Sequence, residues 1–315
     1  MTTDQKQAQR NCVYGPAPSR RLGQSLGVDL VPYKTCTYDC IYCQLDRTTH
    51  KTTERSEWLS PDEIVTEIRE KLDPAPDYIT LTGSGEPTLY ASIGTLIAGI
   101  KEITSIPVAV LTNGSLLWKP DVRGSLMQAD LVMPSLCAGT EYLFKYVNRA
   151  HPNITFDKMM EGLIQFRREF RGQYWLEVFV LSGVTTVEAQ VENLARCIER
   201  INPDRVQVNT VVRPPVEGYA TPVPQERLEQ IARRLHETAE VIAEYTPGLQ
   251  VVPGPGAHRK DILALLQRRP CSIADLACGL SLYPHEVTKY VEELRDQGAV
   301  EEASRDGQVY YTGAM

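Results

Sequence analysis

The sequence has little that would attach the protein to a membrane or, through charge alone, to a nucleic acid. Its longest apolar runs, such as "VAVL" at 108–111, are far below the ~20 residues that a bilayer-spanning helix needs. The formal net charge of -7 gives no general attraction for nucleic acid or for an anionic surface, so such a partner would need a local patch. The polar start "MTTDQKQAQR" predicts no signal peptide. We expect a cytoplasmic protein with no membrane partner.

Cysteines are unevenly distributed along the chain. Of eight in 315 residues, three stand within eight positions in "KTCTYDCIYCQ" (34–44). In a reducing cytosol, cysteines act as ligands, catalytic groups or small buried side chains more often than as disulfides. With 42% apolar residues, the chain has ample material for a sizeable core, and its length favours two domains or one large domain with an appendage.

Short β-rich runs alternate with segments of helical period over the first three quarters of the chain. Six such β-α units in series predict a parallel sheet, arranged as an open or partial (β/α)6 barrel with its chemistry on the loops after the strands. The segment "SPDEIVTEIREKL" predicts a helix with a capping box formed by Ser60 and Glu63, and with Pro61 in its first position. The candidate strands are 25–31, 78–82, 108–112, 131–135, 175–181 and 205–209, and a sixth helix is expected near 225–244.

The end of the chain predicts a separate small domain. We assign 1–245 to the barrel, 246–257 to a Gly- and Pro-rich linker, and 258–315 to three helices followed by two short β segments, an order that resembles a winged helix-turn-helix. Residues 258–315 carry seven Lys or Arg against nine Asp or Glu. A DNA reader needs cations that face phosphate. The balance therefore favours contact with a protein, peptide or subunit over DNA.

The three clustered cysteines, Cys36, Cys40 and Cys43, have the spacing C-x3-C-x2-C. A structural zinc site usually shows four ligands in two pairs, and no second pair follows here. Three thiolates fit a [4Fe-4S] cluster that leaves one iron open to a substrate or cosubstrate. Zinc completed by His50 or Cys12, or three unligated thiols, are the alternatives.

With Tyr42 before the third cysteine, this segment resembles the signature of the radical S-adenosylmethionine (SAM) superfamily. The resemblance implies that the open iron binds the amino and carboxylate groups of SAM. Reduction of the cluster by a donor such as flavodoxin or ferredoxin would then cleave SAM to a 5′-deoxyadenosyl radical that abstracts hydrogen. In such enzymes the cofactor carries the chemistry, and the protein supplies orientation and excludes water.

A second segment, "LTGSGEPTL" (81–89), supports the resemblance. Ser84, Gly85 and Glu86 match the Gly-Gly-Glu-like motif that holds the ammonium of SAM in this superfamily. Glycine lets the backbone approach a ligand, and a carboxylate accepts from a cationic amine. The alternative is an ordinary Gly-rich turn with a solvated Glu.

Other strand ends offer weaker candidates. The resemblance implies that Ser135 contacts the ribose of SAM and that Arg149 meets its methionine carboxylate, while Asn113 follows the third strand; a turn residue and a surface charge are the alternatives for Asn113 and Arg149. Glu177 and Asn209 are polar positions in apolar strands and are expected to line the barrel, unless backbone groups satisfy them in the core. The expected SAM-binding set is Tyr42, Ser84, Gly85, Glu86, Asn113, Ser135, Arg149 and Asn209.

Within the superfamily, residues 14–220 most resemble the Fe-S oxidoreductase group that includes the wyosine-type tRNA synthases. Those synthases carry a second cluster on three further cysteines ahead of the signature, and here only Cys12 precedes it. This departure argues against that reaction. Cys137 stands where the group often has Asp, and we expect a small buried thiol there.

Arginines near the strand ends are the candidates for substrate binding. Arg20 and Arg21 precede the first strand and Arg213 follows the sixth, where guanidinium groups suit phosphate or carboxylate. Solvated arginine is the alternative for all three, and Lys34 either acts similarly or balances the charge of the cluster. The leading hypothesis is a radical SAM enzyme that acts on a tRNA base, a peptide or protein, or a small molecule. The rival is an iron-sulfur redox sensor that binds DNA through the winged helix.

Overall fold

The main sheet of the protein has eight strands in the order β1-β2-β5-β6-β7-β8-β9-β10. The computed structural model describes residues 12–242 and 259–314, apart from 281, 283 and 306–307, so the expected linker at 246–257 lies outside the described residues. Neighbouring strands from β2 to β10 pair in parallel, and β1 runs antiparallel to β2. The predicted α/β fold with a mostly parallel sheet is confirmed. The strands are β1 (Val13–Ser19), β2 (Gly23–Asp29), β5 (Tyr78–Thr82), β6 (Val108–Thr112), β7 (Leu131–Leu136), β8 (Gln173–Phe179), β9 (Arg205–Asn209) and β10 (Ala239–Val241).

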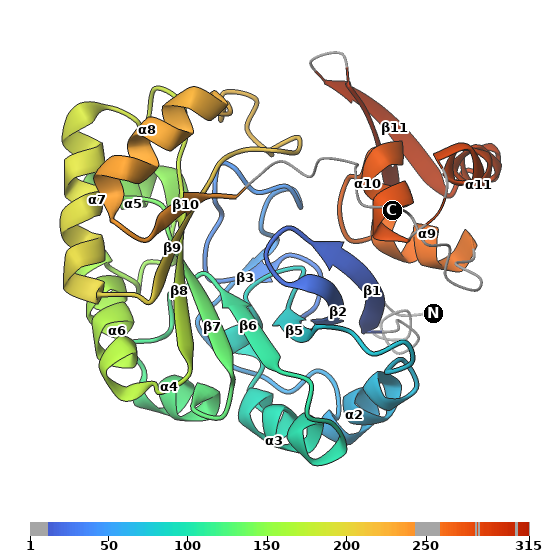
Figure 1. Cartoon of the computed structure of the whole chain (residues 1–315), viewed down its shortest axis with the longest axis horizontal. Helices are drawn as coiled ribbons and strands as arrows, with labels where there is room; N and C mark the ends of the chain where they lie inside the picture. The colour runs from blue at the N-terminus through green and yellow to red at the C-terminus, as the bar shows by residue number, and fades with distance from the viewer. Residues whose placement is uncertain (1–11, 243–258, 281, 283, 306–307, 315) are drawn as a thin grey trace.

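Helices line the outer face of the curved sheet (Figure 1). Each places a stripe of apolar side chains against the strands; α7, for example, buries Val191, Leu194 and Ile198, as expected for an amphipathic helix on a sheet. Among the described residues, no helix is both long and apolar enough to cross a bilayer. The helices of this layer are α2 (Pro61–Arg69), α3 (Ile93–Ile103), α4 (Pro120–Leu126), α5 (Glu141–Asn148), α6 (Phe156–Glu169), α7 (Glu188–Ile201) and α8 (Gln225–Leu235).

The structure departs from the sequence prediction at the two edges of the sheet. Strand β1 has the sequence "VYGPAPS", whose prolines argue against a strand but are tolerated at an edge, where one row of N–H groups has no ladder partner. The predicted helix near 225–244 is wrong in its second half, because α8 ends at Leu235 and β10 follows. Ser60 is the N-cap of α2, and Pro61 is the first residue of the helix, as predicted. The Ser60 side chain makes no capping hydrogen bond, so the expected capping box does not form.

The described C-terminal residues have the predicted order of elements and their own apolar core. Three helices, α9 (Arg259–Leu266), α10 (Ile273–Gly279) and α11 (Pro284–Asp296), precede the antiparallel hairpin of β11 (Val300–Arg305) and β12 (Gln308–Gly313). The side chains that form this core include Ile262, Leu266, Leu276, Val287, Val291 and Leu294.

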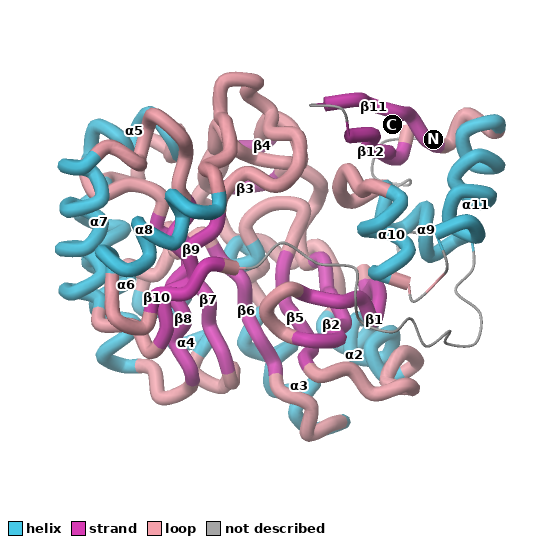
Figure 2. Tube along the Cα trace, turned by 45° about the horizontal axis from the view of Figure 1, so that its top comes forward, coloured by secondary structure: helices cyan, strands magenta, loops and turns pink. Residues whose placement is uncertain are grey.

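This C-terminal unit packs beside β1, as Figure 2 shows for α9 and α10. The ring of Tyr14 is the main contact. On one side it covers Gly27 of β2, where an added Cβ would lie 2.2 Å from a ring carbon. On the other side the guanidinium of Arg268 lies 4.4 Å from the ring centroid, a cation-π distance. The unexpected edge strand therefore joins the barrel to the C-terminal unit.

Substitutions at two glycines test how tightly the helices pack against their neighbours. A Cβ on Gly162 of α6 would lie 2.3 Å from the Trp118 backbone nitrogen, whereas a Cβ on the exposed Gly124 of α4 would meet nothing within 4 Å. We expect Gly162→Ala to lower the free energy of unfolding by about 1–3 kcal/mol through overpacking. Gly124→Ala, the control, should raise it by about 0.5–1 kcal/mol because alanine favours helix. Urea titration measures both, and equal effects would contradict the packing.

Candidate active site

The loop of residues 36–43, which carries the three clustered cysteines, is held by backbone hydrogen bonds on both sides. On one side, the N–H groups of Asp39 and Ile41 donate to the carbonyls of Asn148 and Val147, each at 3.0 Å. On the other side, the Val216 N–H donates to the Cys43 carbonyl at 2.9 Å. The loop thus takes its conformation from the end of α5 and the segment after β9.

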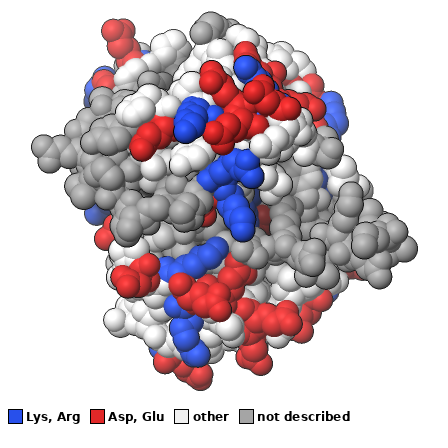
Figure 3. Space-filling model, turned by 90° about the vertical axis from the view of Figure 1, so that its right-hand side faces the viewer, with Lys and Arg blue, Asp and Glu red and all other residues white. Residues whose placement is uncertain are grey.

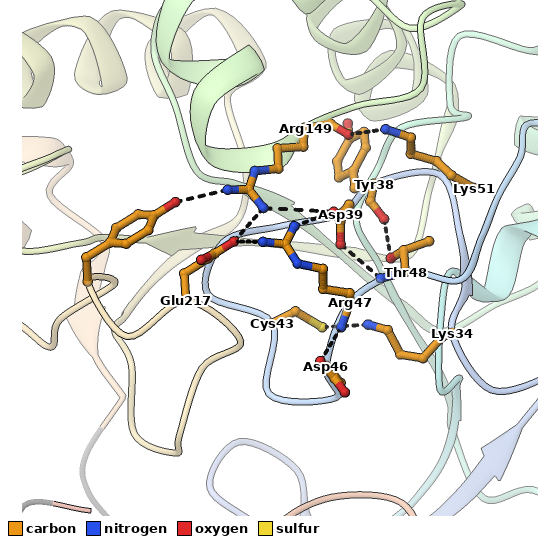
Figure 4. A network of polar contacts seen from close by, with 11 residues as sticks. Lys34, Tyr38, Asp39, Cys43, Asp46, Arg47, Thr48, Lys51, Arg149 and Glu217 are labelled. Carbon is orange, nitrogen blue, oxygen red and sulfur yellow. Dashed lines mark hydrogen bonds and ion pairs between the residues drawn. The ribbon is translucent and has the colours of Figure 1, made fainter.

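Ion pairs also hold the cysteine loop in place (Figure 4). Glu217 accepts from Arg149 at 2.7 Å and also pairs with Arg47, and both arginines lie against Asp39 of the cysteine loop. The hydroxyl of Tyr219 accepts from Arg149 at 2.9 Å. The guanidinium of Arg149 is therefore held by protein groups that fix the loop, and its contact with the carboxylate of SAM stays a prediction.

Each of the three loop cysteines has its own N–H donor. Asn113 Nδ2 lies 3.7 Å from Cys36 Sγ, Asn148 Nδ2 lies 3.5 Å from Cys40 Sγ, and Lys34 Nζ lies 3.1 Å from Cys43 Sγ. These donors come from the turn after β6, from α5 and from the segment after β2. Hydrogen bonds to sulfur are a known means by which proteins stabilise and tune iron-sulfur clusters.

The loop cysteines also differ from the remaining ones in exposure. Cys36, Cys40 and Cys43 are free thiols that are partly exposed, while the other described cysteines are buried. Desolvation, with the nearby Glu86 charge, raises the pKa of the Cys36 thiol to about 12, and binding of iron would release its proton. Three partly exposed cysteines on one fixed loop, each with a donor, fit a [4Fe-4S] cluster.

The "SGE" turn lies directly against the cysteine loop. A Cβ on Gly85 would come within 1.8 Å of the Thr35 carbonyl oxygen, so glycine is needed there for contact with the loop. The Lys34 N–H donates to the Ser84 carbonyl at 2.7 Å, and the Glu86 N–H donates to the Thr35 carbonyl at 3.1 Å. Asp29, at the end of β2, accepts from the Ser84 hydroxyl at 2.5 Å.

The side chain of Glu86 is buried and links two turns by hydrogen bonds. It is only 1% exposed, and its oxygens accept from the Thr88 N–H at 3.0 Å, the Thr112 hydroxyl at 2.5 Å and the Asn113 N–H at 2.8 Å. Burial raises the pKa of Glu86, although these donors counteract the shift. The carboxylate joins the turn after β5 to the turn after β6 and so sets the position of the Asn113 side chain.

Tyr42 has two partners within the barrel. Its ring stacks on Phe179 of β8 with centroids 4.1 Å apart, and its hydroxyl lies 2.7 Å from Cys137 Sγ. Cys137 is 4% exposed, in agreement with the expected small buried thiol. Its sulfur fixes the orientation of the Tyr42 ring next to the cysteine loop.

Polar side chains from three adjacent strands meet at Glu177, as the parallel register of β7, β8 and β9 requires. Its carboxylate accepts from Ser135 at 2.9 Å and from Asn209 at 3.0 Å, and pairs with Arg21 at 2.9 Å. Burial opposes ionisation of Glu177, but Arg21, Asn209 and Ser135 outweigh it and lower the pKa. Glu177 and Asn209 line the cavity, as the sequence predicts; side chains satisfy Glu177, whereas Asn209 donates to Glu177 and accepts from the backbone N–H of Thr210 at 3.0 Å.

A cavity of about 610 Å³ adjoins these groups, within the usual size range of small-molecule sites. Of the three loop cysteines, Cys43 lines it. Of the expected SAM-binding residues, Tyr42, Ser84, Ser135 and Asn209 line it, whereas Gly85, Glu86, Asn113 and Arg149 are not among its lining residues. The C-terminal unit contributes as well, through Arg268, Arg269, Cys271, Asp275, Gln308 and Tyr310. The sequence gives no signal for this second wall, because it depends on how the two parts pack.

Sequence motifs do not predict several residues of the site. Asp29, Asn148 and Phe179 each fix a predicted residue, yet all three are ordinary residues at the ends of elements. Cys12, the alternative zinc ligand, lies instead beside Glu67 of α2, with Sγ 3.1 Å from the carboxylate. Position at the carboxyl end of a parallel strand was the usable signal for Asp29 and Phe179.

Comparison with known proteins places the chain in a family. Residues 30–198 match the model "Radical SAM superfamily". The chain is 38% identical over 303 residues to a protein of Brachyspira hyodysenteriae named GTPase Obg, but covers only 45% of that protein's length. It is 36% identical over 235 residues to a UPF0026 protein of Methanocaldococcus jannaschii, covering 73% of this chain and 72% of the relative.

Two solved structures share the fold at low sequence identity. A radical SAM methyltransferase from Sphaerobacter thermophilus superimposes with a TM-score of 0.52 at 17% identity, over 69% of this chain and 66% of that one. HydG, a maturase of the [FeFe]-hydrogenase, superimposes with a TM-score of 0.51 at 12% identity, over 85% and 57%. With the family match and the relative from Methanocaldococcus jannaschii, these findings establish that the chain belongs to the radical SAM superfamily, whose members use a [4Fe-4S] cluster and S-adenosylmethionine.

Proposed function

We propose that this protein is a radical SAM enzyme in which Cys36, Cys40 and Cys43 hold three irons of a [4Fe-4S] cluster and SAM binds the fourth. The single observation that carries the proposal is that three partly exposed thiols share one fixed loop and each has an N–H donor. When bound and reduced, the pair of cofactors supplies a 5′-deoxyadenosyl radical that abstracts hydrogen from the substrate. The electron comes from a low-potential donor of the flavodoxin or ferredoxin kind.

The residues of this chain orient SAM in two ways. Tyr42, Ser84, Ser135 and Asn209 line the cavity and contact SAM directly, with the Tyr42 ring held flat by Phe179. Glu86 acts on SAM indirectly, because its carboxylate already accepts hydrogen bonds from Thr88, Thr112 and Asn113. It fixes the position of the turn of residues 84–86, which would hold the ammonium of SAM.

The C-terminal residues 258–315 form a winged helix that closes the reaction chamber. Support comes from their order of three helices and a hairpin, and from the side chains that they contribute to the cavity. The chain gives no support for DNA reading. On the face in Figure 3, Lys and Arg are interspersed with Asp and Glu, whereas duplex binding requires several cations that neutralise phosphates.

Replacing a cluster ligand should abolish the cluster. We expect Cys36→Ala, Cys40→Ala or Cys43→Ala, each reconstituted anaerobically, to lack the visible absorption of the cluster and to form no 5′-deoxyadenosine from SAM, because a site with two thiolates cannot hold the cube. Cys197→Ala, on α7, is the control and should retain both. A cluster in the Cys40→Ala protein, or zinc as the bound metal, would refute the assignment.

Glu86→Gln distinguishes a brace from a direct SAM ligand. An amide NH2 cannot accept the hydrogen bonds that a carboxylate oxygen accepts, so the variant should lose about 1.5–3 kcal/mol of unfolding free energy even without cofactors. Glu63→Gln, on the exposed face of α2, should lose almost nothing. Normal stability of the cofactor-free Glu86→Gln protein together with weakened SAM binding in calorimetry would mean that Glu86 contacts SAM directly.

Lys34 should tune the cluster. Its ammonium lies beside Cys43 and favours the reduced, more negative state. Removing this charge in Lys34→Met should lower the midpoint potential by on the order of tens of millivolts, while Lys101→Met, on the outside of α3, should leave it unchanged. Redox titration followed by electron paramagnetic resonance measures the shift. A higher or unchanged potential in Lys34→Met would show that this contact does not influence the cluster.

A further inference from the structure

The cavity is basic although the chain as a whole is acidic. Five arginines and three carboxylates line it, in a protein whose formal net charge is -7. The arginines come from distant parts of the sequence: the β1-β2 turn, the segment after β9, and the segment after α9. Cations that converge in a cleft attract anionic ligands. The charged lining residues are Arg20, Arg21, Asp29, Glu177, Arg213, Arg268, Arg269 and Asp275.

Two of these arginines contact groups of the protein itself. Arg21 pairs with Glu177 at 2.9 Å, and Arg268 stacks on Tyr14 and donates to the Ala264 carbonyl at 2.7 Å. Asp29, the remaining carboxylate near them, is occupied by Ser84. These contacts are structural, so they do not account for the excess of positive charge.

Arg20 and Arg213 lack such compensation. Arg20 makes no hydrogen bond or ion pair with another residue in the described part of the chain, and burial together with the charges of Arg213 and Arg21 lowers its pKa to about 10. The Arg213 side chain is 12% exposed, its Nε is buried and has no partner among the described groups, and its other contacts are long, at 3.3 Å to Gln44 Oε1 and 3.7 Å to Asp275 Oδ1. Burial and Arg269 lower the pKa of Arg213 as well. Buried cations that repel one another require an anion.

We propose that Arg20 and Arg213, with Arg269 in the same cavity lining, form a binding site for the phosphate or carboxylate group of a small substrate. Guanidinium groups bind such oxyanions through paired N–H donors. The site lies next to the proposed cluster, because Gln44, which accepts from Arg213, directly follows Cys43. The inference rests on the proposed function only in treating the cavity as the reaction chamber.

The site is shared between the two parts of the protein. Arg20 and Arg213 belong to the barrel, while Arg269 follows α9 and Asp275, which pairs with Arg213, lies on α10. An anion held among them would join the C-terminal unit to the barrel. The C-terminal unit thus recognises substrate, and the enclosure by both parts favours a small molecule over a nucleic acid.

The experiment uses the full-length chain and inorganic phosphate as the probe. Calorimetry and thermal melts in a buffer free of oxyanions compare phosphate with acetate, with and without saturating SAM. We expect phosphate or acetate to bind the wild-type chain and raise its melting temperature, and the stronger of the two to identify the substrate group. Arg20→Gln and Arg213→Gln should weaken this binding roughly ten-fold or more. Arg200→Gln, on the exposed face of α7, is the matched control.

The outcomes separate the possible roles of these arginines. Loss of anion binding in Arg213→Gln with an unchanged melting temperature in anion-free buffer and unchanged SAM affinity supports the site. Equal binding in Arg213→Gln and Arg200→Gln would overturn it. A matching loss of SAM affinity would assign the arginines to the carboxylate of SAM, and tight binding of tRNA that needs these arginines would replace the small molecule by RNA; either result overturns the proposal. Because phosphate binding needs no cluster, failure of SAM cleavage would leave this test intact.

Discussion

The hydrogen bonds that hold residues 36–43 are the constraint on which the rest of the site depends. This loop places three cysteines where neighbouring strand ends can reach them, yet beyond Cys36 it forms no helix or strand of its own. Its backbone is bound by Asn148 and Val147 on one side and by Val216 on the other. Since these partners belong to α5 and to the segment after β9, the geometry of the thiols is set by parts of the chain that are distant in sequence. A loop fixed in this way loses little further entropy when iron binds.

The residues of the sequence motifs around the loop also act by holding it in place. Gly85 and Glu86 resemble ligand contacts in the sequence, but in the structure they bring the turn after β5 against Thr35 and join it to the turn after β6. Tyr42 is likewise held by Phe179 and Cys137. One layer of residues thus supports a second layer that faces the cavity, as catalytic geometry requires. On the opposite wall, the C-terminal unit adds arginines that give the chamber its preference for anions.

The sequence predicts the repeated and the local features well. Six parallel strands follow from runs of buried apolar residues, and the cysteine spacing predicts the cluster site that we propose. Strand β1 escapes prediction because its prolines are acceptable only at a sheet edge, which no local pattern reveals. The same limit applies to Glu86, whose role depends on donors from Thr112 and Asn113 that the fold brings to it, and to Arg149, whose partner Glu217 is far away in sequence. The arrangement of the C-terminal unit beside Tyr14 is a tertiary contact of the same kind.

The central claim is that three protein thiolates hold a cluster with one iron left for SAM. Mössbauer spectroscopy of the full-length chain, reconstituted anaerobically with ⁵⁷Fe and titrated with SAM, tests it most directly. The account predicts that one iron of the four is distinct and that its isomer shift and quadrupole splitting change when SAM is added. Four equivalent irons that do not respond to SAM would contradict the account.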